Sequence, residues 1–215
     1  MKRKLQILII INFIIITANA QSLAAGENHS LFLCNNSNMM STGWNQFGQL
    51  ADNTIIDKSM PVLTATSNFP FTNVNCGWRH SLFLKNDSTV WASGLNSDGQ
   101  LGDGTNTDKQ TPIQVSNLTK IIAIAGGRYH SLFLKNDSTV WGCGTNMYGQ
   151  LGGGLASPPI NIATQVPGIN GVIDIAAGDD YSIFLKSNGT VWTCGYNNNG
   201  QLGMARHQIE KLLYR

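Results

Sequence analysis

A twelve-residue stretch, HSLFLKNDSTVW, occurs twice without change, at residues 80–91 and 130–141. Looser copies, YSIFLKSNGTVW and HSLFLCNNSNMM, occupy residues 181–192 and 29–40, so that successive copies begin 50 or 51 residues apart. Self-similarity at a fixed period of this length indicates a repeat architecture, in which one unit alone cannot bury its apolar face. We therefore expect a row of similar units that stack on one another.

Each repeat predicts four short β-strands. In the third unit we expect strands at residues 112–115, 121–125, 130–134 and 140–143. The fourth copy places Asn188-Gly189 between its last two strands, which is a strong hairpin signal. Strands that read IIAIA and SLFL lack the alternation that a sheet with one wet face requires, so both faces should be covered. Four-stranded sheets stacked face to face predict an all-β fold of the β-propeller type.

The first twenty residues have the pattern of a secretory signal peptide. Three basic residues at positions 2–4 precede an apolar run at 5–16, and the small-residue sequence ANA at 18–20 precedes Gln21. The apolar run is too short for an ordinary membrane-spanning helix. We therefore expect removal of residues 1–20 and a mature chain that begins at Gln21 in the periplasm, cell envelope or medium. The alternative is an uncleaved anchor. No later stretch is long and apolar enough to cross a membrane.

The charge of the mature chain argues against nucleic acid as a partner. The first twenty residues hold three of the 14 Lys and Arg residues and none of the 12 Asp and Glu residues, which leaves 11 basic against 12 acidic side chains. Nucleic-acid binders usually gather a basic excess on one face, because neutralisation of phosphates drives their affinity. A hydrophobic content of 42% is enough to bury a core, so disorder is also disfavoured.

The four cysteines, Cys34, Cys76, Cys143 and Cys194, form no Cys-x-x-Cys pair, so the sequence indicates neither a zinc knuckle nor a thioredoxin-like site. Export would permit disulfides, and Cys143 and Cys194 occupy the same place in successive copies. A bridge between them depends on how closely those copies approach. We favour the simpler interpretation, in which the cysteines pack as small strand residues.

A glycine block follows each hairpin. It reads GLNSDGQLG at 94–102, GTNMYGQLG at 144–152 and GYNNNGQLG at 195–203, and the first copy, GWNQFGQLA, ends in Ala51. Together with AGGRYHSLFL at 125–134 and VW at 140–141, the pattern resembles the repeat of the regulator of chromosome condensation family over nearly all of residues 24–203. The resemblance implies blades of a seven-bladed propeller. The family often has Trp directly before the block, whereas in three copies of this chain a Trp (Trp91, Trp141 or Trp192) stands three positions before it.

The repeats are too few for a closed seven-bladed ring. The sequence indicates about three complete four-stranded blades, preceded by a half-blade, the hairpin at 29–43, which we expect to lack its first two strands. Residues 204–215 leave the pattern and form a non-repeat tail after the propeller repeats of residues 21–203. Unpaired strand edges at both ends favour self-association or marginal stability.

Signals for chemistry are weak. His29, His80 and His130 share one repeat position, but the fourth copy has Tyr181 there, so hydrogen bonding within the strands is favoured over a metal site. The sequence NSDG at 96–99 lacks the first and last acidic ligands of a calcium loop, and no Gly-Lys-Ser/Thr follows a glycine block. The adjacent acids Asp179 and Asp180 suggest a solvated turn more than a general acid and base. We therefore expect no catalytic residue, metal or cofactor.

Comparison of the copies separates scaffold from variation. The residues that change lie after the Ala-Gly pair, or its equivalent, and within the glycine block, and the antiparallel order of the strands places both sets at one end of the blades. The variable positions include Trp44, Phe47, Leu95 and Met147. Aromatic residues and Arg are enriched in protein-binding surfaces. From these positions we predict a protein contact surface of Trp78, Arg79, Arg128, Tyr129, Tyr148 and Tyr196. The turns at the opposite end, at 86–88 and 136–138, repeat as Asn-Asp-Ser without change.

The favoured function is an exported, non-enzymatic module that binds another protein, by analogy with secreted propellers that include an inhibitor of β-lactamase. The family resemblance implies an alternative, because the namesake of the family is a nuclear guanine-nucleotide exchange factor for a small GTPase. A third class is a glycan-acting propeller enzyme. That class would need inward carboxylates from several blades, whereas the copies share only the turn acids Asp87 and Asp137.

Overall fold

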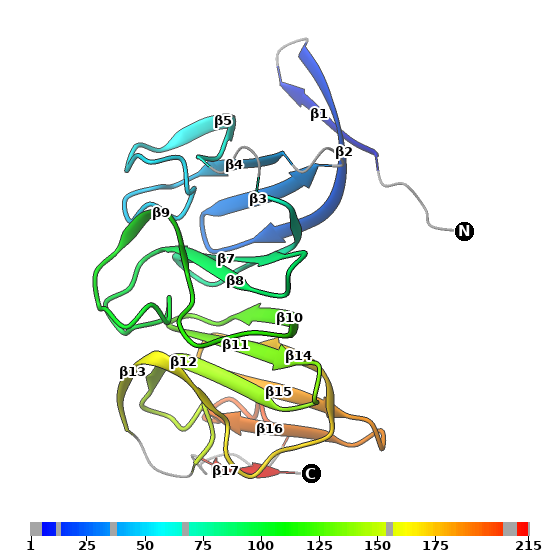
Figure 1. Ribbon diagram of the computed structural model, residues 1–215, viewed down its shortest axis with the longest axis vertical. Helices are drawn as coiled ribbons and strands as arrows, with labels where there is room; N and C mark the ends of the chain where they lie inside the picture. Colours follow the sequence, from blue (N-terminus) through cyan, green and yellow to red (C-terminus); the bar gives the residue numbers. More distant parts are fainter. Residues whose placement is uncertain are drawn as a thin grey trace.

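The computed structural model describes residues 6–11, 14–34, 38–65, 69–153, 157–203 and 210–214, and every regular element in these ranges is a β-strand. The strands form four antiparallel sheets, stacked in chain order (Figure 1). The first sheet contains β1 (Gln6–Ile11), β2 (Ile14–Ala25), β3 (His29–Cys34), β4 (Met39–Gly43) and β5 (Lys58–Leu63). The second contains β6 (Phe71–Cys76), β7 (His80–Lys85), β8 (Val90–Gly94) and β9 (Lys109–Gln114).

The third sheet contains β10 (Ile121–Gly126), β11 (His130–Lys135), β12 (Val140–Asn146) and β13 (Ser157–Gln165). The fourth contains β14 (Val172–Ala177), β15 (Tyr181–Lys186), β16 (Val191–Gly195) and β17 (Glu210–Tyr214). Each of these sheets is a meander whose neighbours in the chain are neighbours in the sheet. The predicted all-β, propeller-type fold is therefore confirmed.

Three apolar clusters hold the stack together, one at each junction between sheets. At every junction two aliphatic side chains of one sheet pack with a Phe of the next sheet. These sets are Leu31 and Leu33 with Phe83, Leu82 and Leu84 with Phe133, and Leu132 and Leu134 with Phe184. In the two inner sheets the first five residues of β7 and of β11 are buried, so these sheets are covered on both faces as predicted.

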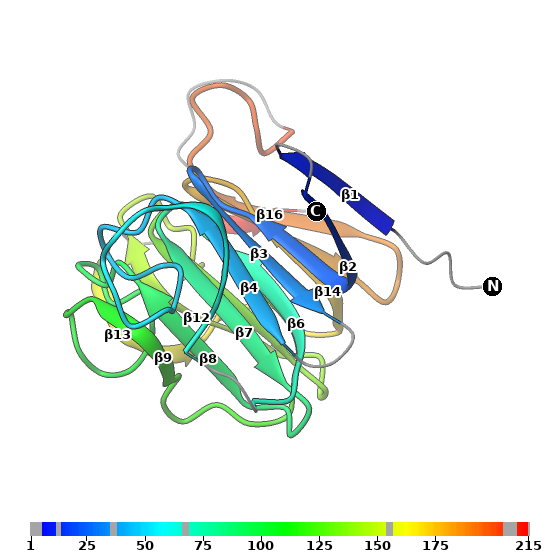
Figure 2. The same cartoon turned by 90° about the horizontal axis from the view of Figure 1, so that it is seen from above.

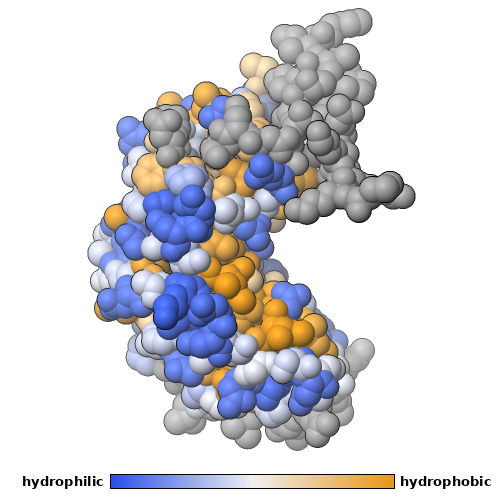
Figure 3. Space-filling view, turned by 45° about the vertical axis from the view of Figure 1, so that its right-hand side comes forward, coloured by the Kyte–Doolittle hydropathy of each residue, from blue (hydrophilic) through white to orange (hydrophobic). Residues whose placement is uncertain are grey.

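The four sheets form an arc and do not close into a ring. The strands β2, β6, β10 and β14, which we call the inner strands, contact each other in this order and line the inner side of the arc. Figure 2 shows the outer strands β9 and β13 on the opposite side. In the space-filling view the molecule is a crescent, and apolar residues gather in its hollow (Figure 3). Exposed apolar side chains of the inner strands include Leu23, Ile122 and Ile173.

One sequence expectation about the order of strands is wrong. The strand expected at 112–115 was placed first in the third sheet, but β9 pairs with β8 and is the last strand of the second sheet. The outer strand of a sheet thus follows the glycine block of that sheet. For the same reason the hairpin at 29–43 is not a bare half-blade, because β2 pairs with β3 and β5 pairs with β4.

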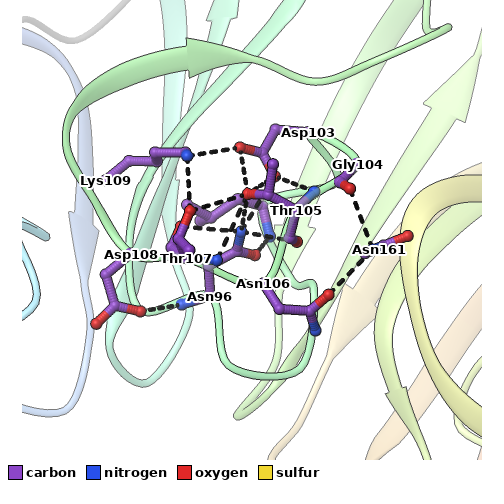
Figure 4. A network of polar contacts seen from close by, with 10 residues as sticks. Asn96, Asp103, Gly104, Thr105, Asn106, Thr107, Asp108, Lys109 and Asn161 are labelled. Carbon is purple, nitrogen blue, oxygen red and sulfur yellow. Dashed lines mark hydrogen bonds and ion pairs between the residues drawn. The ribbon is translucent and has the colours of Figure 1, made fainter.

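A buried Asn in the glycine block explains this strand order. The Asn96 side chain donates to Asp103 Oδ1 (3.1 Å) and to the Thr105 carbonyl (3.0 Å) (Figure 4). It also accepts from the Leu101 backbone N–H (2.9 Å). Lys109, at the start of β9, forms an ion pair with Asp103 (3.2 Å). These contacts turn the chain back against β8. Asn45, Asp52 and Lys58 make the corresponding contacts before β5, including a 3.3 Å ion pair between Lys58 and Asp52.

The two chain ends complete the outer sheets. β2 pairs with β3 only from Ala20 to Ala25, and its earlier residues pair with β1 in a hairpin that projects from the body (Figure 1). At the other end β17, which lies in the non-repeat tail 204–215, pairs with β16 through Thr193↔Tyr214 and Gly195↔Glu210. Among the described residues, no helix is long and apolar enough to cross a membrane.

Candidate protein-binding surface

The predicted contact residues all lie in loops at one end of the sheets. Trp78 and Arg79 lie between β6 and β7, and Arg128 and Tyr129 lie between β10 and β11. Within each sheet the glycine block is bonded to the loop before the second strand. Leu95 N–H donates to the Arg79 carbonyl (2.9 Å), Thr145 N–H to the Tyr129 carbonyl (2.8 Å) and Tyr196 N–H to the Asp180 carbonyl (2.8 Å). These bonds bring both sets of variable positions to the same end.

Backbone hydrogen bonds also tie these loops to one another from sheet to sheet. Glu27 N–H donates to the Trp78 carbonyl (3.3 Å), Trp78 N–H to the Gly127 carbonyl (3.1 Å) and Arg128 N–H to the Asp179 carbonyl (2.9 Å). A loop whose backbone is bonded on both sides loses little conformational entropy when a ligand binds. The side chains on this frame are therefore presented by a pre-organised surface.

The side chains form an alternating stack of cations and rings. Trp78 lies between two guanidinium groups, with Arg79 Cζ 3.9 Å and Arg128 Cζ 4.1 Å from its ring centroid. The Arg128 guanidinium lies 5.3 Å from the Tyr129 ring centroid, and the Trp78 and Tyr129 rings meet edge to face at 5.2 Å. All four side chains are half-buried. Cations over Trp rings attract the ring quadrupole, so the stack is held together by its own contacts.

Two residues that the sequence prediction left out extend the stack. Arg79 Cζ lies 4.7 Å from the Trp44 ring centroid and 5.6 Å from that of Phe47. Trp44 and Phe47 themselves meet edge to face at 5.3 Å. Both stand at variable positions of the first glycine block, and this is the signal that could have found them. We call Trp44, Phe47, Trp78, Arg79, Arg128 and Tyr129 the Arg–aromatic stack.

The other two predicted residues form a separate pair. The rings of Tyr148 and Tyr196 lie 4.9 Å apart at an angle of 64°. The backbone N–H of Tyr148 donates to Gln150 Oε1 (3.0 Å). The Gln that recurs in every glycine block therefore also positions the variable residue two places before it. Among the described contacts, none joins this tyrosine pair to the Arg–aromatic stack. The structure thus brings four of the six predicted residues into one cluster and the other two into a second.

The charge of the surface is mixed. Arg79 Nε lies 3.4 Å from Glu27 Oε2, and burial raises the pKa of Asp180 although the nearby Arg128 lowers it. Next to the stack, the ends of the inner strands enclose a hollow of about 440 Å³, whose lining includes Glu27, Trp78 and Asp179. The surface therefore offers aromatic faces, two cations and acidic groups within a short distance.

The turns at the opposite end have a structural explanation. Asp87 Oδ1 accepts from the Thr89 hydroxyl (2.6 Å) and the Thr89 backbone N–H (3.0 Å), and Asp137 bonds Thr139 in the same way. The bond from the Thr89 side chain, together with Lys85, lowers the pKa of Asp87 to about 2. Unchanged Asn-Asp-Ser sequences are thus explained by closure of the hairpins.

The histidines join the sheets instead of forming a common site. His29, His80 and His130 are buried, and their Nε2 atoms lie 3.0, 2.9 and 3.1 Å from the Oγ atoms of Ser81, Ser131 and Ser182 in the next sheet. Burial lowers the pKa of His80 to about 3 and those of the other two to about 4, so all three are neutral near pH 7. Among the described residues, no cluster of three His, Cys, Asp or Glu side chains could hold a metal ion.

All four cysteines are free. Cys76, Cys143 and Cys194 pack in the apolar clusters, as the simpler interpretation predicts, whereas Cys34 is half-buried and lies outside them. Cys143 Sγ and Cys194 Sγ each lie 3.3 Å from the backbone carbonyl oxygen of a glycine-block Gln, Gln100 and Gln150. Burial raises the pKa of Cys194 to about 12 and that of Cys143 further still. No disulfide joins Cys143 to Cys194.

The chain is an open β-propeller built from repeated blades. Its stacked antiparallel sheets, the repeated glycine blocks and the loop surface at one end define this class. A family model described as the RCC1-like domain matches residues 9–212. The chain belongs to this RCC1-like domain family, which confirms the resemblance found in the sequence.

Relatives are longer than this chain. The human probable E3 ubiquitin-protein ligase HERC6 is 35% identical over 192 residues, which are 86% of this chain and 19% of that protein. The crystal structure of human WBSCR16 superposes with a TM-score of 0.80 at 25% identity, over 92% of this chain and 52% of that one. The structure of Prp20p from Saccharomyces cerevisiae gives 0.76 at 22% identity, over 91% and 50%. This chain thus spans about half the length of the matched structures and a fifth of the ligase.

Proposed function

We propose that this chain is an exported, non-enzymatic module that binds another protein through the Arg–aromatic stack. One observation carries the proposal: Trp78 lies between the guanidinium groups of Arg79 and Arg128, on loops whose backbones are bonded from sheet to sheet. Trp, Tyr and Arg dominate binding hot spots, and pre-organisation lowers the entropic cost of association. Prp20p, a structural neighbour, is described by its binding to Gsp1p and histones, which supports a protein partner for this chain.

The proposal assigns the remaining surfaces as well. The tyrosine pair Tyr148–Tyr196 is a secondary contact, and the opposite turns at Asp87 and Asp137 make none. No described feature points to nucleic acid. The open ends of the sheet stack provide a second kind of interaction, self-association between copies of the chain.

Binding should depend on the stack and not on the opposite end. The partner would first be captured on the purified protein from a cell-envelope fraction and identified by mass spectrometry. Calorimetry then compares Trp78→Ala and Arg128→Ala with Asn136→Ala, a matched change in an exposed turn at the other end. Truncation of a hot-spot residue costs about 2 kcal/mol or more, a loss of about thirtyfold in affinity. Weaker binding only with Asn136→Ala would reject the surface.

Export forms the second part of the proposal. The basic, apolar and small-residue segments of residues 1–20 support it, and so does the register of β2. Removal of residues 1–20 would leave the pairs from Ser22↔Leu33 to Ala25↔Ser30, so the first sheet keeps its inner strand. Amino-terminal sequencing of the native protein should find Gln21. A cytoplasmic product that retains Met1 would contradict export.

An exchange factor for a small GTPase is the second candidate, favoured by membership of the RCC1-like domain family. The capture experiment separates the two functions. If the captured partner is a small GTPase, release of a fluorescent guanine nucleotide from it should accelerate with the wild-type chain and not with Trp78→Ala.

A further inference from the structure

The two end sheets carry faces that match each other. At each internal junction two aliphatic residues of one sheet pack with a Phe of the next. Because successive side chains of a strand point to opposite faces, Ile183 and Leu185 lie on the outer face of the fourth sheet, away from Phe184. By the same argument Phe32 lies on the outer face of the first sheet, away from Leu31 and Leu33. Ile183, Leu185 and Phe32 are only half-buried, unlike their counterparts in the inner sheets.

Among the described residues, both outer faces include apolar side chains that are partly exposed. Val191 of β16 is 49% exposed, whereas Val90 and Val140 at the same repeat position are fully buried at the internal junctions. Leu23 of β2 is 42% exposed, whereas its equivalents Val74 and Ile124 are 2% and 5% exposed. Each of these inner-strand residues pairs in register with the Phe of its sheet. The end faces therefore have the composition of junction halves.

The polar groups of the two end sheets also match those of an internal junction. At an internal junction the buried His of one sheet contacts a Ser of the next sheet, and that Ser donates to the Gln carbonyl of the first sheet, as Ser131 does to Gln100 (2.8 Å). In the first sheet Ser30 holds the Ser position, and among the described residues no His or Gln carbonyl of a preceding sheet faces it. In the fourth sheet Tyr181 holds the His position and Gln201 holds the Gln position.

We infer that the outer face of the fourth sheet docks onto the outer face of the first sheet of a second copy of this chain. The inference rests on the proposed self-association and specifies its surfaces. The contact repeats the internal junction: Ile183, Leu185 and Val191 cover Phe32 and Leu23, and Ser30 reaches the Gln201 carbonyl. It is head-to-tail, because each partner contributes a different face. The partner is a second copy because every chain carries both faces of this junction, one on its first sheet and one on its fourth.

Two charge substitutions separate the faces. Leu23→Glu blocks the first-sheet face and Val191→Glu blocks the fourth-sheet face. Both side chains are exposed in the single chain, and neither belongs to one of the three apolar clusters. Met60→Glu is the matched control, because Met60 is 60% exposed on an outer strand and its repeat equivalent Thr111 is also exposed. Circular dichroism checks that all variants keep the fold.

Sedimentation velocity over a range of concentrations gives the test. The wild-type chain and Met60→Glu should associate, and each blocking variant alone should weaken association by about a hundredfold or more, because a buried unpaired carboxylate is strongly unfavourable. An equimolar mixture of Leu23→Glu and Val191→Glu should recover a one-to-one dimer, since one intact face of each kind remains. A wild-type chain that stays monomeric would overturn self-association itself. Association that survives both variants, or a mixture that stays monomeric, would overturn only the head-to-tail pairing.

Discussion

His80 Nε2 lies 2.9 Å from Ser131 Oγ, across the boundary between the second and third sheets. The single hydroxyl hydrogen of Ser131 is used by the Gln100 carbonyl at 2.8 Å, so His80 must be the donor. The ring is therefore the neutral tautomer with its hydrogen on Nε2. Its Nδ1 is a buried atom without a hydrogen-bond partner among the described residues, and the same is true of His29 and His130.

Replacement of Ser131 should uncouple the two sheets at this point. Ser131→Ala removes the acceptor of His80 and the donor to Gln100, and a buried polar group left without its partner costs about 1–3 kcal/mol. Urea unfolding at low protein concentration measures the change in the free energy of unfolding. The matched control is Ser30→Ala, because Ser30 has the same repeat position without a facing His, and it should change stability by less than about 0.5 kcal/mol. Equal losses from both variants would contradict the role of the His–Ser bond.

Stability should fall in mild acid. The folded pKa values of the three histidines, about 4, 3 and 4, are lower than the unfolded value near 6.5, because burial disfavours the charged ring. The unfolded chain then binds more protons, so this stability is fully present above about pH 6.5 and is lost as pH falls towards 4. Three protons give a slope of at most about 4 kcal/mol per pH unit.

Between pH 6.5 and 5 the lowered pKa values of Asp52, Asp87, Asp103 and Asp137 do not yet affect stability. The raised pKa of Asp180 acts with the opposite sign, so a loss of stability in this window comes from the histidines. Urea unfolding at several pH values should show the slope in wild type and a slope about one third smaller in His80→Gln. A stability that does not change across this window would show that the histidines are charged or exposed.

Loss of the Asn96 side chain should destabilise the second sheet strongly. Asn96 is fully buried and bonds Asp103, the Thr105 carbonyl and the Leu101 N–H, so Asn96→Ala should cost about 2–4 kcal/mol in urea unfolding. Asn197→Ala is the matched control at the same position of the fourth sheet. The Asn197 Oδ1 accepts from Leu202 N–H, and among the described residues its Nδ2 has no hydrogen-bond partner, so a loss of about 1 kcal/mol is expected. A larger effect at Asn197 would contradict this explanation.

Two glycines separate backbone strain from steric contact. Gly99 has φ +77°, and a Cβ atom there would lie 2.5 Å from Asn161 Cα of the next sheet. Gly189 has a similar φ of +80°, but no atom lies within 4 Å of where its Cβ atom would be. Gly189→Ala should cost about 1 kcal/mol for conformation alone, and Gly99→Ala about 1–3 kcal/mol more. Thermal unfolding of both variants measures the difference, and equal melting temperatures would disprove the close approach.

Thiol reactivity should follow burial. Cys34 is half-buried, whereas Cys76, Cys143 and Cys194 are buried in the apolar clusters with raised pKa values. Only the thiolate reacts with an aromatic disulfide reagent, so the native protein should release one equivalent quickly, and four only after unfolding. Replacement of Cys34 by Ser should abolish the fast phase.

The sequence predicted the fold because its strongest signals are local and repeated. HSLFL and the glycine block indicate strands and turns in every copy, and the lack of alternation predicted sheets covered on both faces. The assignment of the outer strand failed because a strand such as Lys109–Gln114 carries no sign of which neighbour it will pair with. The contacts of Asn96 with Asp103 and Lys109 decide it, and the repeated pairs Asp52-x-Thr54 and Asp103-x-Thr105 were the available signal.

The predicted contact surface was only partly resolvable from sequence. Variation between copies identified Trp78, Arg79, Arg128 and Tyr129, and strand direction placed them at one end. Which rings and cations stack depends on the angle between neighbouring sheets, which no single repeat encodes. For this reason Trp44 and Phe47 were left out, whereas Tyr148 and Tyr196 form a cluster of their own.

The hydrogen bonds between neighbouring sheets determine the order in which parts of the molecule unfold locally. The glycine-block loop of one sheet reaches the outer strand of the next, as Gly104 N–H does with the Asn161 carbonyl (2.8 Å) and Asn53 N–H with the Gln110 carbonyl (3.1 Å). Each inner sheet therefore has two neighbours to restrain it, and each end sheet has one. In a linear array of coupled units, free energies of opening depend on nearest neighbours. Amide protons of β7 and β11 should exchange most slowly with solvent, and local unfolding should spread from the ends inwards.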